Sequence, residues 1–172
     1  MTSKDYIKQA YCEAMLDLCE EKDINKITVN DVVERVGTAR QTFYNRFHDI
    51  NDLICHVHIQ YTEDSYAREP DPRVALCNVF LFALEHKAFY RQLPFHSAQN
   101  CFRDTFLQWC IDSSSKLVNL DRSDDDYSRK QTAIYLYSAG VAELFLEWCR
   151  GGMTSPYELV VDAIMEAEVP FS

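Results

Sequence analysis

The stretch ITVNDVVERVGTARQTFYNRF, near the N-terminus, contains two short helical patterns separated by one glycine. Thr28 precedes the first pattern and Asp31 stands three positions later, a spacing typical of a capping box at a helix start. Gly37 ends this pattern, because glycine readily adopts the left-handed conformation that closes helices. In the second pattern Phe43 and Phe47 are four residues apart and so share one helix face. Two short helices joined by a tight, glycine-containing turn predict a helix-turn-helix.

The rest of the chain also favours helices. Glycine and proline interrupt helices, and the 172 residues include only four glycines and five prolines. Apolar residues recur at helical spacing, whereas no alternating pattern has a useful length for strands. The sequence therefore predicts an all-α fold, with a helix-turn-helix domain over residues 1–50 and a C-terminal helical domain over residues 51–172. The helices outside the helix-turn-helix are expected at about 4–21, 49 or 51 to 66, 72–94, 98–118, 129–150 and 156–168.

The charge distribution leaves room for one local contact with nucleic acid. The whole chain has a formal net charge of −10, which argues against nonspecific DNA binding by the surface as a whole. Residues 37–48, however, contain two arginines, one histidine and no carboxylate. A carboxylate in this stretch would repel phosphate groups, so its absence points to DNA as the binding partner.

The chemistry of the second helix assigns roles to its residues. In a DNA-binding helix-turn-helix, the N-terminal end of this helix meets the edges of bases in the major groove. Arg40 and Gln41 occupy that end, and their side chains can pair with guanine and adenine, respectively. They are the predicted base readers. The predicted phosphate contacts are hydroxyl and cationic side chains nearby, namely Thr28, Thr42, Tyr44, Arg46 and His48.

Residues 27–53 resemble the DNA-binding signature of the TetR family of bacterial transcriptional regulators. The matching pattern is a helix-start threonine, a turn glycine and a Thr-aromatic-Tyr-x-x-Phe run, found here at Thr28, Gly37, Thr42, Phe43, Tyr44 and Phe47. The resemblance implies about nine helices, a homodimer on a palindromic double-stranded DNA operator, and a C-terminal cavity for a small-molecule effector. The C-terminal stretches HKAFYRQL and YSAGVAELFLEWCRGGMTSPYELV are similar to a subgroup with a compact C-terminal domain, which includes dihydroxyacetone kinase operon activator-like proteins.

Two positions differ from the common pattern of the family. Ile50 stands where a lysine commonly donates to phosphate, and Ala39 stands where a serine often begins the recognition helix. We expect Thr38 to cap this helix instead, and Arg46 or His48 to supply the phosphate contact. The family as a whole favours an effector-controlled repressor, and the subgroup favours an activator. A TetR-like interaction module that has lost DNA binding is the alternative from a different class.

The last two predicted helices are the expected dimer interface, over residues 129–150 and 156–168. The first of them, QTAIYLYSAGVAELFLEWC, is apolar nearly all round, which indicates burial on more than one side. Ser155, Pro156 and Glu158 predict the start of the final helix, with Ser155 as its N-cap.

In the predicted C-terminal domain, several aromatic, histidine and cysteine residues could serve either the structure or the binding of a ligand or metal. The candidates for lining an effector pocket are Phe102, Phe106, Trp109 and Tyr135, although aromatic residues at helical spacing more often pack in a core. Cys55, His56 and His58 form the motif CHVH, but three residues so spaced cannot converge on one ion within a regular helix. A metal-sensing site would need one of these three residues to combine with a histidine or cysteine from another helix. We predict no metal and no cofactor.

The remaining patterns bear on chemistry and location. No phosphate-binding glycine loop and no His-Glu-x-x-His motif is present, so nothing positive predicts an enzyme. The seven cysteines are scattered without a Cys-x-x-Cys pair and are expected to be reduced thiols. No apolar signal segment precedes them, and no apolar run approaches the ~20 residues needed to cross a bilayer. The expected location is the cytoplasm, with no membrane contact.

Overall fold

The computed structural model describes residues 3–69, 71–96, 99–123 and 125–167 and confirms the predicted all-α class. Within these ranges it contains nine α-helices and two short 3-10 helices, and no strand. The elements in chain order are α1 (Ser3–Glu21), η1 (Ile24–Lys26), α2 (Val29–Val36), α3 (Arg40–Tyr44), α4 (Ile50–Arg68), α5 (Pro72–Glu85), α6 (Lys87–Tyr90), η2 (Leu93–Phe95), α7 (Gln99–Leu117), α8 (Tyr127–Arg150) and α9 (Tyr157–Glu166).

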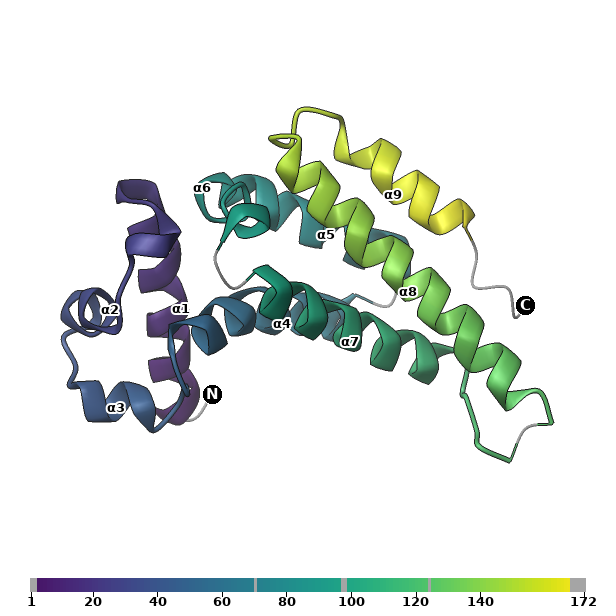
Figure 1. The fold of residues 1–172 in the computed structure, drawn as a ribbon, viewed down its shortest axis with the longest axis horizontal. Coiled ribbons are helices and arrows are strands. Elements are labelled where there is room, and N and C mark those ends of the chain that lie inside the picture. The colour runs from purple at the N-terminus through teal and green to yellow at the C-terminus, as the bar shows by residue number, and fades with distance from the viewer. Residues whose placement is uncertain (1–2, 70, 97–98, 124, 168–172) are drawn as a thin grey trace.

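The helices are arranged in an elongated molecule (Figure 1). The three N-terminal helices α1, α2 and α3 gather at one end, and α3 lies at the edge of that end. Helix α4 leads from this end into the other helices, where it packs against α5 and α7. Helices α8 and α9 lie along the opposite side of the molecule from α4. The predicted helix-turn-helix is therefore displayed at one end of the fold.

Local sequence signals set the ends of α2. The hydroxyl of Thr28 accepts a hydrogen bond from the backbone N–H of Asp31 at 3.3 Å, and the Asp31 carboxylate accepts one from the Thr28 N–H at 2.7 Å. This is the predicted capping box. Lys22 contacts the same carboxylate at 2.6 Å, and together with Thr28 it lowers the pKa of Asp31 to about 2. Gly37 closes the helix with a φ of 74°, which glycine adopts without the strain a side chain would add.

Two sequence-based predictions of helix ends are wrong. The helix predicted over 72–94 is broken at His86, so α5 ends at Glu85 and the short α6 and η2 follow. Ser155 does not cap the last helix, because α9 begins after Pro156 without a side-chain cap. The Ser155 carbonyl instead accepts a hydrogen bond from the Trp148 indole at 2.9 Å. The predicted end of this helix, residue 168, lies outside the described residues.

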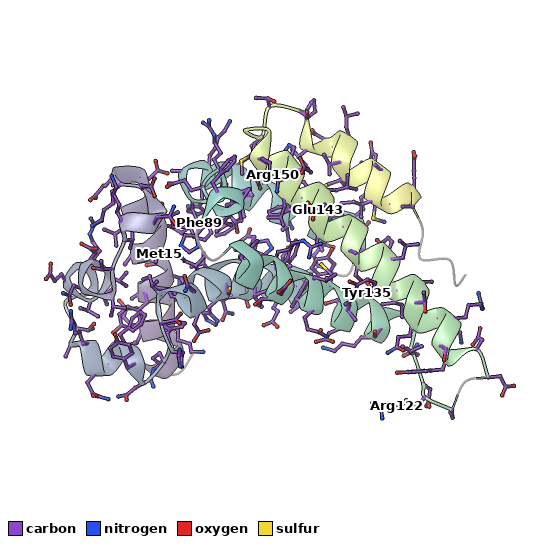
Figure 2. All side chains as sticks on the ribbon, viewed as in Figure 1. Met15, Phe89, Arg122, Tyr135, Glu143 and Arg150 are labelled. Carbon is purple, nitrogen blue, oxygen red and sulfur yellow. The ribbon has the colours of Figure 1, made fainter. Side chains whose placement is uncertain are left out.

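The break after α5 allows α6 and η2 to fold back against α1. Met15 of α1 and Phe89 of α6 are buried at this contact, which Figure 2 shows between the N-terminal helices and the rest of the molecule. Gln92 bridges the same contact. Its side-chain oxygen accepts a hydrogen bond from the Ile24 N–H at 2.7 Å, and its amide nitrogen donates to the Cys19 and Ala88 carbonyls. The N-terminal helices are thus joined to the rest of the molecule by polar as well as apolar contacts.

None of the described helices combines the length and the apolar character that crossing a membrane requires. The described cysteines Cys12, Cys19, Cys55, Cys77, Cys110 and Cys149 are free thiols.

Candidate DNA-binding surface

Helix α3 has only five residues, so its position depends on its buried side chains. Phe43 and Phe47 are 0% and 3% exposed, and their ring centroids lie 5.5 Å apart. Tyr11 of α1 meets both rings edge-on, at 5.4 Å and 6.1 Å. The Tyr11 hydroxyl also forms a hydrogen bond of 2.7 Å with the Thr38 hydroxyl. These contacts hold the turn and α3 against α1.

The bond to Tyr11 explains a further difference from the sequence-based expectation. Thr38 was expected to cap α3 in place of a serine. The N-cap is Ala39, which has no side chain that can form the capping bond, and the Thr38 hydroxyl contacts Tyr11 instead. The first N–H groups of α3 are therefore not satisfied by a side-chain cap.

The two predicted base readers lie on the exposed side of α3. Arg40 and Gln41 are exposed and stand in its first turn. The Nε of Arg40 donates a hydrogen bond to the side-chain oxygen of Asn30 in α2. The Gln41 amide donates one to the side-chain oxygen of Asn45 at 3.2 Å. Sequence reasoning did not select either asparagine, and the ten-residue separation of Asn30 from Arg40 gives no helical spacing that would have revealed the pair.

The predicted phosphate contacts differ in how available their polar groups are. Tyr44 is 52% exposed, and the side chain of His48 is 90% exposed. Thr42 is half-buried. The Arg46 Nη1 donates to the Asn45 carbonyl at 3.2 Å, while its Nε is buried without a hydrogen-bond partner among the described residues. The Thr28 hydroxyl already donates to Asp31 at 2.8 Å, so a phosphate would have to compete with the capping box.

The start of α4 offers no obvious phosphate site. Ile50 is the first residue of this helix and packs partly against the core. The Asp49 carboxylate caps the helix by accepting hydrogen bonds from the N–H groups of Asn51 and Asp52, at 2.8 and 3.0 Å. These bonds, led by that from Asp52, lower the pKa of Asp49, so its charge persists at neutral pH. A bound anion would face this carboxylate, which leaves Arg46 and His48 as the nearby candidates.

The four aromatic residues proposed for an effector pocket do not converge on one cavity. Trp109 lines a groove of about 240 Å³ together with Tyr66, Leu76 and Tyr137. Phe106 and Trp109 line a much smaller space of about 30 Å³ beside it. Phe102 is buried, whereas Tyr135 is 56% exposed on α8 and lines none of these spaces (Figure 2).

The core behind this groove is organised around His58, one of the three residues of the CHVH motif. His58 is 1% exposed, and its Nδ1 lies 2.9 Å from the Tyr90 hydroxyl. The rings of Phe102, Phe106 and Phe145 surround it, with centroids 4.5 to 5.5 Å away. Burial lowers the pKa of His58 to about 3, so its imidazole is neutral at physiological pH.

His56 and His58 turn to different parts of the molecule. The His56 ring packs against Phe47, 5.3 Å between centroids, while His58 faces Tyr90 and the aromatic core. The described residues include no group of three histidine, cysteine, aspartate or glutamate side chains that would hold a metal ion.

The outer faces of α8 and α9 carry large exposed apolar side chains. Leu136 and Leu159 are 74% and 64% exposed, and Tyr135 and Leu144 are also exposed. A groove of about 350 Å³ runs between the two helices, lined by Ala133, Leu136, Tyr137, Val141, Leu144, Ile164 and Ala167. Monomeric soluble proteins rarely leave a contiguous apolar face of this kind uncovered.

A bundle of nine described helices with the short, exposed α3 at one end is the architecture of a TetR-like fold. Solved structures with a similar fold include the following two. "Dihydroxyacetone kinase operon activator DhaS" has a TM-score of 0.66 at 18% identity, over 92% of both chains. The TetR family repressor AlkX from Dietzia sp. strain DQ12-45-1b, described as implicated in biodegradation of n-alkanes, has a TM-score of 0.57 at 16% identity, over 91% of this chain and 93% of that one.

At these identities the likeness concerns the fold. No protein-family model matches the chain, and no curated protein matches its sequence. Both similar structures belong to regulators and not to enzymes, which fits the absence of catalytic motifs in the sequence.

Proposed function

We propose that this protein is a DNA-binding transcriptional regulator of the TetR type, which binds a palindromic operator as a homodimer. The observation that supports this most strongly is the two-sided character of α3. Its buried side is fixed by Phe43, and its exposed side presents Arg40, Gln41 and Tyr44 with no carboxylate in the helix. An acidic protein that keeps one exposed, anchored helix free of acids is suited to bind a polyanion there.

The proposed roles follow the chemistry of the side chains. Arg40 and Gln41 read bases, and Tyr44, Arg46, Thr42 and His48 contact phosphates, with a weaker part for the occupied hydroxyl of Thr28. Residues 1–50 form the proposed DNA-binding domain, and residues 51–172 form the proposed dimerisation domain. Because its target is DNA, the proposal places the protein in the cytoplasm of its cell.

Binding to duplexes from the protein's own gene neighbourhood, measured at several salt concentrations, tests this proposal. Arg40→Ala should lower the affinity for the operator by about 1–3 kcal/mol and relax specificity at one base pair. Arg46→Ala should weaken binding to all sequences and reduce the salt slope by about 1, because it removes a phosphate contact.

Arg122→Ala is the matched control for these two substitutions. Arg122 is exposed between α7 and α8, at the end of the molecule far from α3 (Figure 2), so its loss should leave binding unchanged. If the unchanged protein binds no duplex even at low salt, the function proposed here is wrong. The interaction module without DNA binding would then be favoured, as Ile50 and the net acidity suggest.

We infer that the exposed face of α8 and α9 is the dimer interface. Dimerisation through this face would bury Leu136 and Leu159 and cover the groove of about 350 Å³. It would also join two copies of α3, which must lie one helical turn of DNA apart, about 34–36 Å, to read both halves of a palindrome.

Leu136→Glu should convert the dimer to a monomer and raise the dimer dissociation constant at least about 100-fold, since an unpaired carboxylate would be buried in each half of the interface. Sedimentation velocity measures the change, and operator affinity should fall with it. Leu81→Glu is the control, because Leu81 is an exposed leucine of α5 that does not line the groove. Equal association of the Leu136 variant and the unchanged protein would place the interface elsewhere.

Effector control, as expected for a repressor of this type, is proposed at the groove that Trp109 and Tyr66 line. Its volume of about 240 Å³ is below the usual range of roughly 300–1,000 Å³ for ligand pockets, so it suits a small molecule. The hydrogen bonds of Gln92 to Ile24 and Cys19 link the proposed dimerisation domain to the N-terminal helices. An activator remains the alternative, and the sign of the expression change on deletion of the gene separates the two.

A further inference from the structure

Each of the two predicted base readers is held by an asparagine outside the set of predicted DNA contacts. Arg40 donates through Nε to the Oδ1 of Asn30, and Gln41 donates through Nε2 to the Oδ1 of Asn45 at 3.2 Å. Asn30 belongs to α2, whereas Asn45 follows α3 directly. The two pairs are independent of each other, because they share no residue.

The bond from Arg40 leaves intact the donors that guanine recognition uses. A guanidinium has five N–H donors, and only the one on Nε is used by Asn30. The two terminal nitrogens carry the other four, and a pair of them matches the O6 and N7 acceptors of guanine. Asn30 therefore fixes the plane of the guanidinium without occupying its terminal groups.

The bond from Gln41 has the corresponding effect on an amide. One hydrogen of Nε2 is donated to Asn45, and the other hydrogen and the Oε1 acceptor remain. These are the donor and acceptor that pair with the N7 and N6 of adenine.

Both asparagines are carried by backbone that is itself held in place. Asn30 lies between Thr28 and Asp31, whose reciprocal hydrogen bonds fix the first turn of α2. The Asn45 N–H bonds to the Gln41 carbonyl at 3.1 Å, and Asn45 stands between the buried residues Phe43 and Phe47. A long side chain held from a rigid support loses less conformational freedom on binding.

We propose that Asn30 and Asn45 are positioning residues that determine base specificity, Asn30 through Arg40 and Asn45 through Gln41. The inference rests on the proposed function, since it assumes that these two residues read bases. Without its asparagine, each reader still reaches the groove but samples more orientations, so it pairs with wrong bases more often relative to the right one.

Operator binding with single base-pair substitutions tests the inference. The base pair read by each residue is first identified as the one at which Arg40→Ala or Gln41→Ala no longer discriminates. Asn30→Ala should then reduce discrimination about three- to tenfold at the Arg40 base pair and leave the Gln41 base pair unchanged, as expected for one lost hydrogen bond. Asn45→Ala should show the opposite pattern, so each variant is the control for the other.

Two further variants separate positioning from a merely structural role. Asn30→Asp keeps an oxygen acceptor for Arg40, so it should retain discrimination even though its added charge lowers affinity for every sequence. Asn30→Ala in an Arg40→Ala background should cause no further loss of discrimination, because the residue through which it acts is gone. Thermal unfolding of each variant checks that α2 and α3 remain folded.

The possible results separate a failure of this inference from a failure of the proposed DNA-binding function. Unchanged discrimination in both alanine variants, with specific binding by the unchanged protein, overturns the inference alone. A uniform loss of affinity over all sequences with a smaller salt slope also overturns it, because that result makes the asparagines phosphate contacts. Absence of sequence-specific binding by the unchanged protein overturns the proposed function and this inference together.

Discussion

Phe43→Ala should lower the free energy of unfolding by about 3–5 kcal/mol and abolish sequence-specific binding to DNA. The ring is 0% exposed and lies within 5.5 Å, centroid to centroid, of the rings of Tyr11 and Phe47. Its removal leaves a cavity where α3 meets α1. Because α3 has five residues and no side-chain N-cap, it cannot stay helical without that contact. Chemical denaturation measures the first effect, and fluorescence anisotropy with labelled operator DNA measures the second.

Tyr44→Ala is the informative comparison, because Tyr44 is the next residue on the same helix. Tyr44 is 52% exposed and touches Phe43 edge-on, at 5.5 Å between centroids. Its loss should cost about 1 kcal/mol of stability while still weakening DNA binding, since it removes a proposed phosphate contact. If Phe43→Ala binds the operator as tightly as the unchanged protein, α3 is not the recognition element.

The contrast between these neighbours shows which parts of the site the sequence could predict. A helix start with Thr28 and Asp31, a glycine end and two phenylalanines four apart are local signals, and the structure confirms the helices and caps that they predict. Local signals also separate the buried face of α3 from its exposed face. They do not show that Asn30 reaches Arg40, because that pairing depends on how the turn after Gly37 aligns two helices.

The wrong helix over 72–94 has a similar cause. No glycine or proline interrupts the sequence around His86, and its apolar residues recur at helical spacing. The chain bends there because Phe89 and Tyr90 become buried, with Tyr90 against His58 and Gln92 bonded to the backbone of α1 and η1. These partners lie 32 residues or more away in the sequence. Tertiary contacts thus override a local pattern that is consistent with one long helix.

His58 shows what a local motif leaves open. Within the motif CHVH the sequence allowed a metal ligand only as the minor alternative to a hydrogen-bonded or exposed histidine, and the structure places His58 in an aromatic core with the Tyr90 hydroxyl 2.9 Å from Nδ1. A sequence pattern cannot distinguish a buried, neutral histidine from a ligand, because the difference lies in partners contributed by α6, α7 and α8. The distinction has a measurable consequence in acid.

Stability should fall by about 2 kcal/mol because of His58 alone as the pH drops from about 7.5 to about 5. Burial lowers the pKa of His58 from 6.5 to about 3, so below pH 6.5 the unfolded chain binds a proton that the folded chain excludes. The stabilisation is therefore fully present above the unfolded pKa and is lost progressively as the pH falls toward 3. Most carboxylates titrate below this interval, and the pKa of Asp31, at about 2, lies lower still.

Urea denaturation at a series of pH values, for the unchanged protein and for His58→Gln, isolates this contribution. Glutamine can still hydrogen bond to Tyr90 but does not titrate, so the variant should be less stable at neutral pH and show a flatter slope toward acid. His56, His86 and His96 also have pKa values lowered by burial and contribute slopes of the same sign, which remain in both proteins. Equal slopes for His58→Gln and the unchanged protein would show that the His58 imidazole takes up its proton in the folded state as readily as in the unfolded chain.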